Sequence, residues 1–165
     1  MPRKQTIEKA REDRREGKSP STQAGEFVHE QIDKIRHGEH GARSPQQAIA
    51  IGLTEARRAG VDLPPPKKGK KSTRRSARYA YEAGQGKRKT RRQPRVSRAV
   101  KKVLKHEPRS SASHRALSKQ ARRAAARRSA ASRSAAARKA VRTKGTKGRS
   151  AAAKKAARSR GRRSR

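Results

Sequence analysis

Hydrophobic residues follow a helical period in two stretches near the start of the chain. In the first stretch they fall on an arc of roughly 140° at 100° per residue, and charged residues occupy the opposite side. This pattern predicts a helix that begins after Ser19 or Ser21 and runs to about His37, with Gly38 as its left-handed exit. The apolar residues of this helix are Ala24, Phe27, Val28, Ile32 and Ile35.

The second stretch carries its start and stop signals in the sequence. Ser44 suits the N-cap, Pro45 the first helical position, and Gln47 completes a capping box. Gly60 suits the position that ends a helix in the left-handed conformation. We therefore expect a helix over residues 45–59.

One face of this second helix is made of small residues. Ala48, Gly52 and Ala56 recur every four residues, so another helix can lie close to it. The short loop 38–43 returns the chain, which predicts an antiparallel helical hairpin. Ile51 lies off the small face, and it fits either self-association of the hairpin or a scattered apolar surface residue.

The segments on either side of the hairpin have weaker patterns. Residues 6–16 form helix readily but carry only Ile7 and Ala10 as apolar anchors, so we expect this helix to fray. After the prolines at positions 64–66, residues 72–83 and 97–105 are candidates for brief helices between Gly and Pro breakers.

Composition changes this picture for the C-terminal part. Hydrophobic residues make up 28% of the 165 residues and aromatic residues 2%, too little to bury a core over the whole length. The predicted fold is a small all-α N-terminal helical hairpin followed by a long basic tail, mostly disordered and partly helical. The predicted segments are a charged N-terminal segment (1–18), the hairpin (19–63), a basic linker with short helices (64–117) and an Ala/Lys/Arg-rich tail (118–165).

Positive charge is concentrated in one part of the chain. Residues 1–63 hold 12 Lys and Arg against 10 Asp and Glu, a net charge of +2. Residues 64–165 hold 38 Lys and Arg against two acids, Glu82 and Glu107, a net charge of +36. A chain with this charge requires a polyanionic partner, and solubility alone does not require so much charge.

The C-terminal end shows an imperfect sixteen-residue repeat that starts at Ser118, Ser134 and Ser150. Each unit combines alanine, the best helix former, with a basic pair. In a helix, cations three or four residues apart repel one another, so we expect these units to be only partly helical. Sixteen residues also turn a helix by about 160° modulo a full turn, so a continuous helix scatters the pairs around its surface. The pairs are Arg122 and Arg123, Arg138 and Lys139, and Lys154 and Lys155.

We expect the tail to neutralise phosphates broadly rather than to read bases with one fixed helix. One Phe and two Tyr leave little for base stacking, which disfavours a single-strand specialist. The predicted nucleic-acid-binding residues are Lys67, Lys68, Lys70, Lys71, Arg74, Arg75, Lys87, Arg88, Lys89, Arg91, Arg92, Lys101, Lys102, Arg122, Arg123, Arg127, Arg128, Arg138, Lys139, Lys154, Lys155, Arg158, Arg160, Arg162 and Arg163.

Other chemistry finds little support in the sequence. There is no cysteine, no phosphate-cradling glycine loop and no nucleophile elbow, so we expect neither an enzyme nor a cofactor. His37, Glu39 and His40, with His29 two turns earlier, are the one conceivable metal cluster, and a capping histidine beside a loop histidine explains them better. We expect a cytoplasmic, nucleoid-associated protein without a secretory signal or a membrane span.

Residues 21–69 resemble the N-terminal half of a family of small basic bacterial proteins of uncharacterised function. The similarity extends into the tail through SRAVKKVLK, SHRALSKQAR and the SAAAKKAAR units. Members are often labelled DNA-binding or plasmid-stabilisation proteins, and this is what the resemblance implies. The tail is also similar in composition to the tails of linker histones and bacterial histone-like proteins.

Together these features predict non-sequence-specific binding of nucleic acid, DNA before RNA, by a histone-like protein. An RNA- or ribosome-associated protein is the first alternative, since phosphate neutralisation does not separate RNA from DNA. A protein-interaction module of a plasmid or stress system is the second, with the hairpin binding a partner. No membrane contact is expected, and a homodimer through the hairpin is considered.

Overall fold

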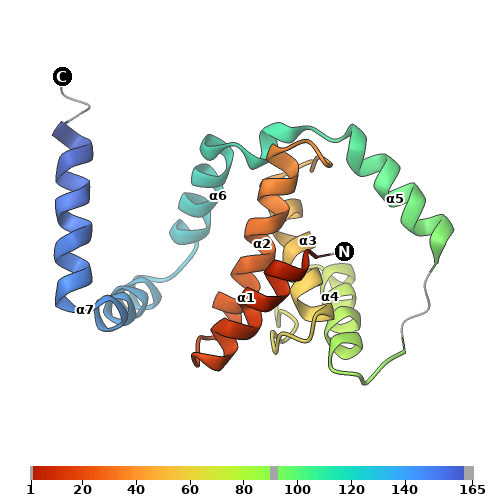
Figure 1. Ribbon diagram of the computed structural model, residues 1–165, viewed down its shortest axis with the longest axis horizontal. Helices are drawn as coiled ribbons and strands as arrows, with labels where there is room; N and C mark the ends of the chain where they lie inside the picture. Colours follow the sequence, from red (N-terminus) through yellow and green to blue (C-terminus); the bar gives the residue numbers. More distant parts are fainter. Residues whose placement is uncertain (1, 90–92, 162–165) are drawn as a thin grey trace. The chain divides into compact units, whose positions relative to one another are not determined.

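The computed structural model describes residues 2–89 and 93–161, and of residues 143, 144 and 160 it describes the backbone alone. The regular secondary structure of the described part is all helical, with loops between the helices (Figure 1). Its elements are α1 (Lys4–Arg15), α2 (Pro20–Arg36), α3 (Pro45–Arg58), α4 (Lys71–Gly84), α5 (Pro94–His106), the 3-10 helix η1 (Arg109–Ala112), α6 (His114–Ala126) and α7 (Ala130–Gly161). The chain divides into two compact units, Met1–Gln120 and Ala121–Arg165.

The expectation of a hairpin followed by a mostly disordered tail is therefore wrong. Helices α4 to α7 occupy most of the region assigned to that tail. Alanine stabilises these helices, and long Lys and Arg side chains can spread into water, so charge repulsion does not prevent them from forming. Serine caps assist at two helix starts, where Ser113 and Ser129 accept backbone N–H bonds at 3.3 and 3.2 Å.

The two helices predicted from the hydrophobic pattern are present. Helix α2 begins at Pro20 with Ser19 at the N-cap position, and Gly38 has the expected positive φ of 80°. Helix α3 begins at Pro45, and the Ser44 side chain accepts the backbone N–H of Gln47. The Gln47 side chain reaches back to the backbone N–H of Arg43 rather than to that of Ser44, at 2.8 Å.

The predicted small-residue face of α3 is where α2 and α3 meet. A Cβ atom on Gly52 would lie 2.7 Å from Val28 Cα and 2.9 Å from the Phe27 carbonyl oxygen. Ala48 and Ala56, one turn away on either side, are fully buried. The backbones of the two helices therefore approach as closely as glycine allows.

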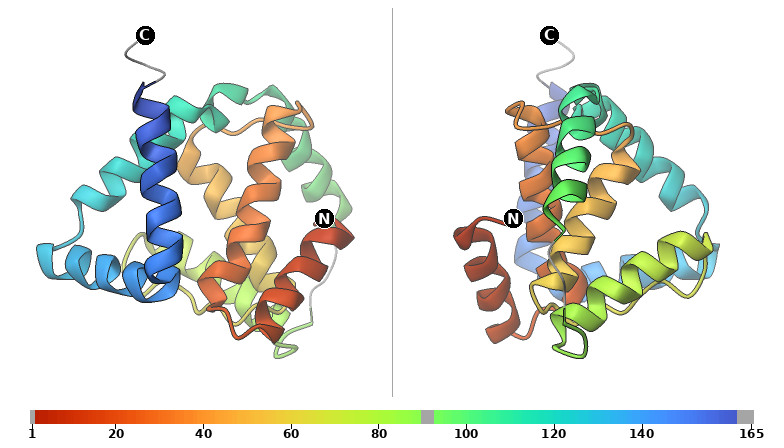
Figure 2. Two further views of the ribbon diagram at one scale, coloured as in Figure 1. Left: turned by 60° about the vertical axis from the view of Figure 1, so that its left-hand side comes forward. Right: turned by 90° about the vertical axis from the view of Figure 1, so that its right-hand side faces the viewer.

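Helix α2 lies between α1 and α3, as Figure 2 shows, and α4 packs on α3. One core cluster forms around Phe27, with Ala10 of α1 and Ala56 of α3. A second cluster surrounds Ile35 and includes Ala112 of η1, which is also fully buried. Residues before and after the hairpin therefore complete its core.

A buried ion pair within α2 also binds the residue that precedes α1. Lys34 Nζ lies 2.6 Å from Glu30 Oε1, with side chains 10% and 3% exposed, and the backbone N–H of Arg3 donates to the same oxygen at 2.9 Å. Burial on its own would raise the pKa of Glu30. The hydrogen bonds from Lys34 and Arg3 outweigh that effect and lower the pKa.

We expect Gly52→Ala to destabilise the first unit by about 1–3 kcal/mol, because its methyl group would collide with the α2 backbone. Gly25→Ala is the matched control, since nothing lies within 4 Å of a Cβ atom there. This exposed helical position should gain roughly 0.5–1 kcal/mol. Calorimetric unfolding measures both variants, and equal melting temperatures would contradict the close approach.

Acid should weaken the first unit through Glu30. The pKa of Glu30 in the folded state lies below its unfolded value of about 4.3. The stabilisation by ionised Glu30 is therefore complete above the unfolded pKa and is lost as the pH falls through the folded pKa. Glu30→Gln should cost about 1–3 kcal/mol at pH 7. It should also flatten the fall in melting temperature between pH 5 and pH 3.

Candidate nucleic-acid interface

Helix α4 packs on the first unit with one side and exposes its Lys and Arg side chains on another. Ala77 and Ala80 are buried against α3, and a Cβ atom on Gly84 would lie 1.8 Å from the Arg57 carbonyl oxygen. Helical spacing places the basic residues on another side, within an arc of about 100°. The basic face of α4 consists of Lys71, Arg74, Arg75 and Arg78, all exposed.

Two side chains fix the end of α4. The Tyr81 hydroxyl donates to Asp62 Oδ1 at 2.6 Å, and this bond raises the pKa of Tyr81. Glu82 pairs with Arg78 at 2.8 Å and with Arg88 at 3.2 Å. The hydrogen bond from Arg78, with a weaker one from Arg88, lowers the pKa of Glu82, which therefore stays negatively charged.

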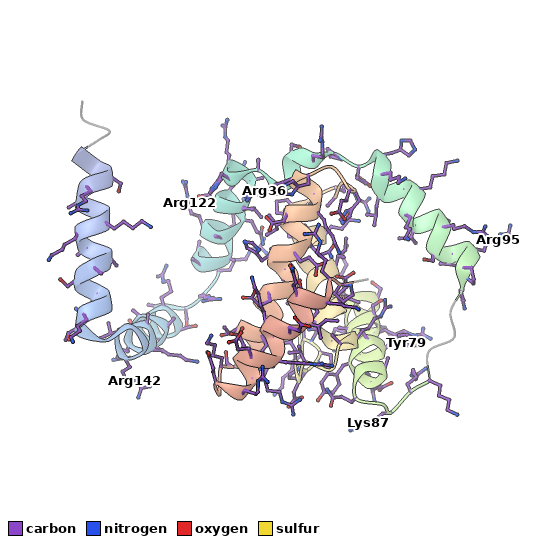
Figure 3. All side chains as sticks on the ribbon, viewed as in Figure 1. Arg36, Tyr79, Lys87, Arg95, Arg122 and Arg142 are labelled. Atoms are coloured by element: carbon purple, nitrogen blue, oxygen red, sulfur yellow. The ribbon has the colours of Figure 1, made fainter. Side chains whose placement is uncertain are left out.

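Helix α5 is attached at its C-terminal end. The backbone N–H of Gly41 donates to the Leu104 carbonyl oxygen at 2.7 Å, and that of Ala42 donates to the Pro108 carbonyl oxygen at 3.2 Å. Gly41 approaches so closely that a Cβ atom would lie 1.8 Å from the Glu107 carbonyl oxygen. The basic face of α5 spans an arc of about 120° and consists of Arg95, Arg98, Lys101, Lys102 and Lys105. Figure 3 shows Arg95 extending away from the ribbon.

Helix α6 begins beside the hairpin of the first unit. The Arg36 Nε–H donates to the Ala112 carbonyl oxygen of η1 at 3.0 Å, and the Gln46 amide donates to Gln120 at 2.6 Å. Along this helix the spacing i, i+4, i+7 and i+8 gathers cations within an arc of about 100°. The basic face of α6 consists of Arg115, Lys119, Arg122 and Arg123.

Helix α7 belongs to the second unit and is divided at Gly145, whose φ of 60° and ψ of −176° are not helical. The described side chains of α7 are all exposed. Before Gly145 the cations spread around the helix. After it, Lys147, Lys154, Lys155 and Arg158 fall within an arc of about 100°.

The structure places the predicted binding residues on helices and in loops, all of them exposed where described. Those in loops are Lys67, Lys68, Lys70, Lys87, Arg88, Lys89, Arg127 and Arg128. Those on helices are Lys71, Arg74, Arg75, Lys101, Lys102, Arg122, Arg123, Arg138, Lys139, Lys154, Lys155 and Arg158. Arg91, Arg92, Arg162, Arg163 and the Arg160 side chain lie outside the described residues.

The sequence analysis missed seven residues that share these basic faces. A search for basic pairs overlooks single cations, whereas helical spacing within each basic segment would have found them. The missed residues are Arg78, Arg95, Arg98, Lys105, Arg115, Lys119 and Lys147.

The candidate metal residues do not assemble. His37 Nδ1 lies 2.8 Å from the Asp33 carbonyl oxygen, and the His40 ring contacts Gln31 Oε1 at 3.1 Å. His29 pairs with the Asp33 carboxylate at 3.0 Å. Within residues 2–89 and 93–161, no group of three or more His, Asp or Glu side chains is placed to hold a metal ion.

None of the helices in those ranges is long and apolar enough to cross a membrane.

Residues 3–68 match the model of a family of unknown function, DUF6496. The matched part contains α1, α2 and α3 and ends before α4. The family description gives no activity or partner. No curated protein matches the chain, and no solved structure matches it.

We expect neutralisation of the α5 basic face to reduce the salt dependence of binding to duplex DNA. Each phosphate contact contributes about −0.9 to the log-log salt slope, so the change R98Q/K101Q/K102Q/K105Q should make the slope shallower by about 3 to 4. The matched control K9Q/R11Q/R14Q/R15Q removes the same charge from exposed positions of α1. Its slope should stay within about 1 of the unmodified chain, and equal effects of the two variants would argue against a defined interface.

Proposed function

We propose that this protein binds duplex DNA with little sequence preference and acts as a nucleoid-associated, histone-like protein. The observation that carries the proposal is the separation of charge, +2 before Pro64 and +36 from Pro64 onward. Basic faces on α4, α5, α6 and the end of α7 present that charge to solvent. Phosphates are the ligand that such faces bind without reading bases.

The aromatic residues support a duplex partner over a single strand. The chain has three, and each is engaged: Phe27 is fully buried, Tyr81 donates to Asp62, and the Arg88 guanidinium lies 5.1 Å from the centre of the Tyr79 ring. A single-strand binder stacks bases on exposed rings. Those three side chains offer no such platform.

The nearly neutral part, α1 to α3, has a different role in this proposal. Its core residues form a bundle to which α4, α5 and η1 are attached by backbone contacts. This bundle therefore holds the basic faces of α4 and α5 in place. The description of the matched family mentions neither DNA binding nor plasmid stabilisation. Both labels therefore belong to the proposal alone.

Competition at one salt concentration tests the proposal with the full chain. Duplex DNA of two unrelated sequences should compete equally, single strands of equal charge less well, and structured RNA no better than duplex DNA. If about ten cations engage DNA, the log-log salt slope should be near −9. Binding that does not depend on salt would refute the proposal, and a clear preference for RNA would replace it with an RNA-associated function. Crosslinking in cells with sequencing of bound DNA and RNA applies the same comparison in vivo.

A further inference from the structure

The chain turns back on itself at the C-terminal end of α4. The backbone N–H of Gly86 donates to the Ala83 carbonyl oxygen at 3.3 Å, and that of Lys87 donates to the Glu82 carbonyl oxygen at 2.9 Å. Gly86 has a φ of 72°, the left-handed conformation that this pair of bonds requires. The Arg88 side chain consequently reaches back to two side chains of α4.

One carboxylate binds an arginine of α4 and an arginine of the loop that follows it. Arg78 Nε lies 2.8 Å from Glu82 Oε1, and Arg88 Nε lies 3.2 Å from Glu82 Oε2. Because each arginine takes one oxygen of the same carboxylate, the two guanidinium groups are held as neighbours. Arg88 also lies 5.1 Å from the centre of the Tyr79 ring, a cation–π contact that further restricts its orientation.

Both ion pairs use Nε, the guanidinium nitrogen nearest the main chain. Binding through Nε leaves the outer edge of a guanidinium, with its two terminal nitrogens, to a second anion. The side chains of Arg78 and Arg88 are 75% and 51% exposed, whereas that of Glu82 is 24% exposed. The cations rather than the acid are therefore the exposed members of this cluster.

A nucleic-acid strand fits this arrangement better than a single anion does. A guanidinium edge binds phosphate oxygens through two parallel N–H bonds. Arg78 belongs to the basic face of α4, and Lys87 and Lys89 flank Arg88 in the loop, so further exposed cations adjoin the cluster. A ligand with one negative charge leaves those cations uncompensated, whereas successive phosphates of one strand engage them together.

We propose that Arg78 and Arg88 form a phosphate clamp in the DNA interface and that Glu82 is its positioning residue. The clamp rests on the proposed function, because it names the side chains that hold successive phosphates of the duplex. Glu82 and Tyr79 keep the two guanidinium groups in place before DNA binds. This role explains why one of the two acids in the basic part of the chain lies next to cations that bind a polyanion.

Exchange of both arginines for lysine tests the clamp at constant net charge. A lysine has one terminal nitrogen, so a lysine that pairs with Glu82 has no outer edge left for a phosphate. In the full chain, R78K/R88K should bind a short DNA duplex at least fivefold less tightly at one salt concentration. Its log-log salt slope should be shallower by about 1 to 2, since two phosphate contacts are lost.

The matched control is R95K/R98K, which makes the same exchange at two exposed positions of α5. Its affinity should stay within twofold of the unmodified chain. Equal affinities of the two lysine variants would overturn the clamp. Absence of DNA binding by the unmodified chain in the same titrations would refute the proposed function as a whole.

Glu82→Gln separates positioning from charge. Removal of a negative charge on its own strengthens binding to DNA, and we expect this of Glu107→Gln, which changes the other acid of the basic part. Glu82→Gln should instead weaken binding at least twofold, because the two arginines lose their shared anchor. Tighter binding by Glu82→Gln would overturn the positioning role.

Melting temperature and helix content, measured for each variant, show whether α4 stays folded. Both should be unchanged in R78K/R88K, because lysine can still pair with Glu82. If Glu82→Gln unfolds α4, R78K/R88K decides between the clamp and its absence, since that variant keeps the ion pairs.

Discussion

The close approach of α2 and α3 at Gly52 is the contact on which the first unit depends. With the two backbones this near, Phe27 and Ile35 of α2 are fully buried among alanines, and only a few larger side chains, such as Leu53 of α3, pack beside them. The same principle recurs where Gly84 meets α3 and where Gly41 meets the end of α5. A chain poor in large apolar residues thus forms a core by bringing backbones together rather than by filling space with side chains.

This mode of packing explains what the sequence could predict. Ser44, Pro45 and Gly60 act locally, so the limits of α3 follow from them directly. The spacing of Ala48, Gly52 and Ala56 indicated the contact face before its partner was known. Local signals and a four-residue period were sufficient for the hairpin.

The rest of the fold depends on contacts that leave only weak signals in the sequence. Alanine is common both in buried faces and in exposed helices, so Ala77, Ala80 and Ala112 did not reveal that α4 and η1 complete the core. Thr6 and Asp13 of α1 are buried although polar, and a count of apolar anchors overlooks them. The tail was expected to be mostly disordered because its apolar content is too low to bury a core, and only partly helical because its cations repel one another. The basic faces combine single cations at helical spacing, which a search for adjacent basic pairs overlooks.

The exposure of every described side chain in α7 has a consequence for how this region can evolve. A buried residue is constrained by its neighbours, whereas a helix that rests on alanine content and carries charge outward constrains only its overall composition. Lys and Arg can exchange, and positions can shift by a turn, without a cost in packing. Relatives should therefore keep the arginine, lysine and alanine content of this helix while their residues drift out of alignment, in contrast to fixed positions such as Gly52.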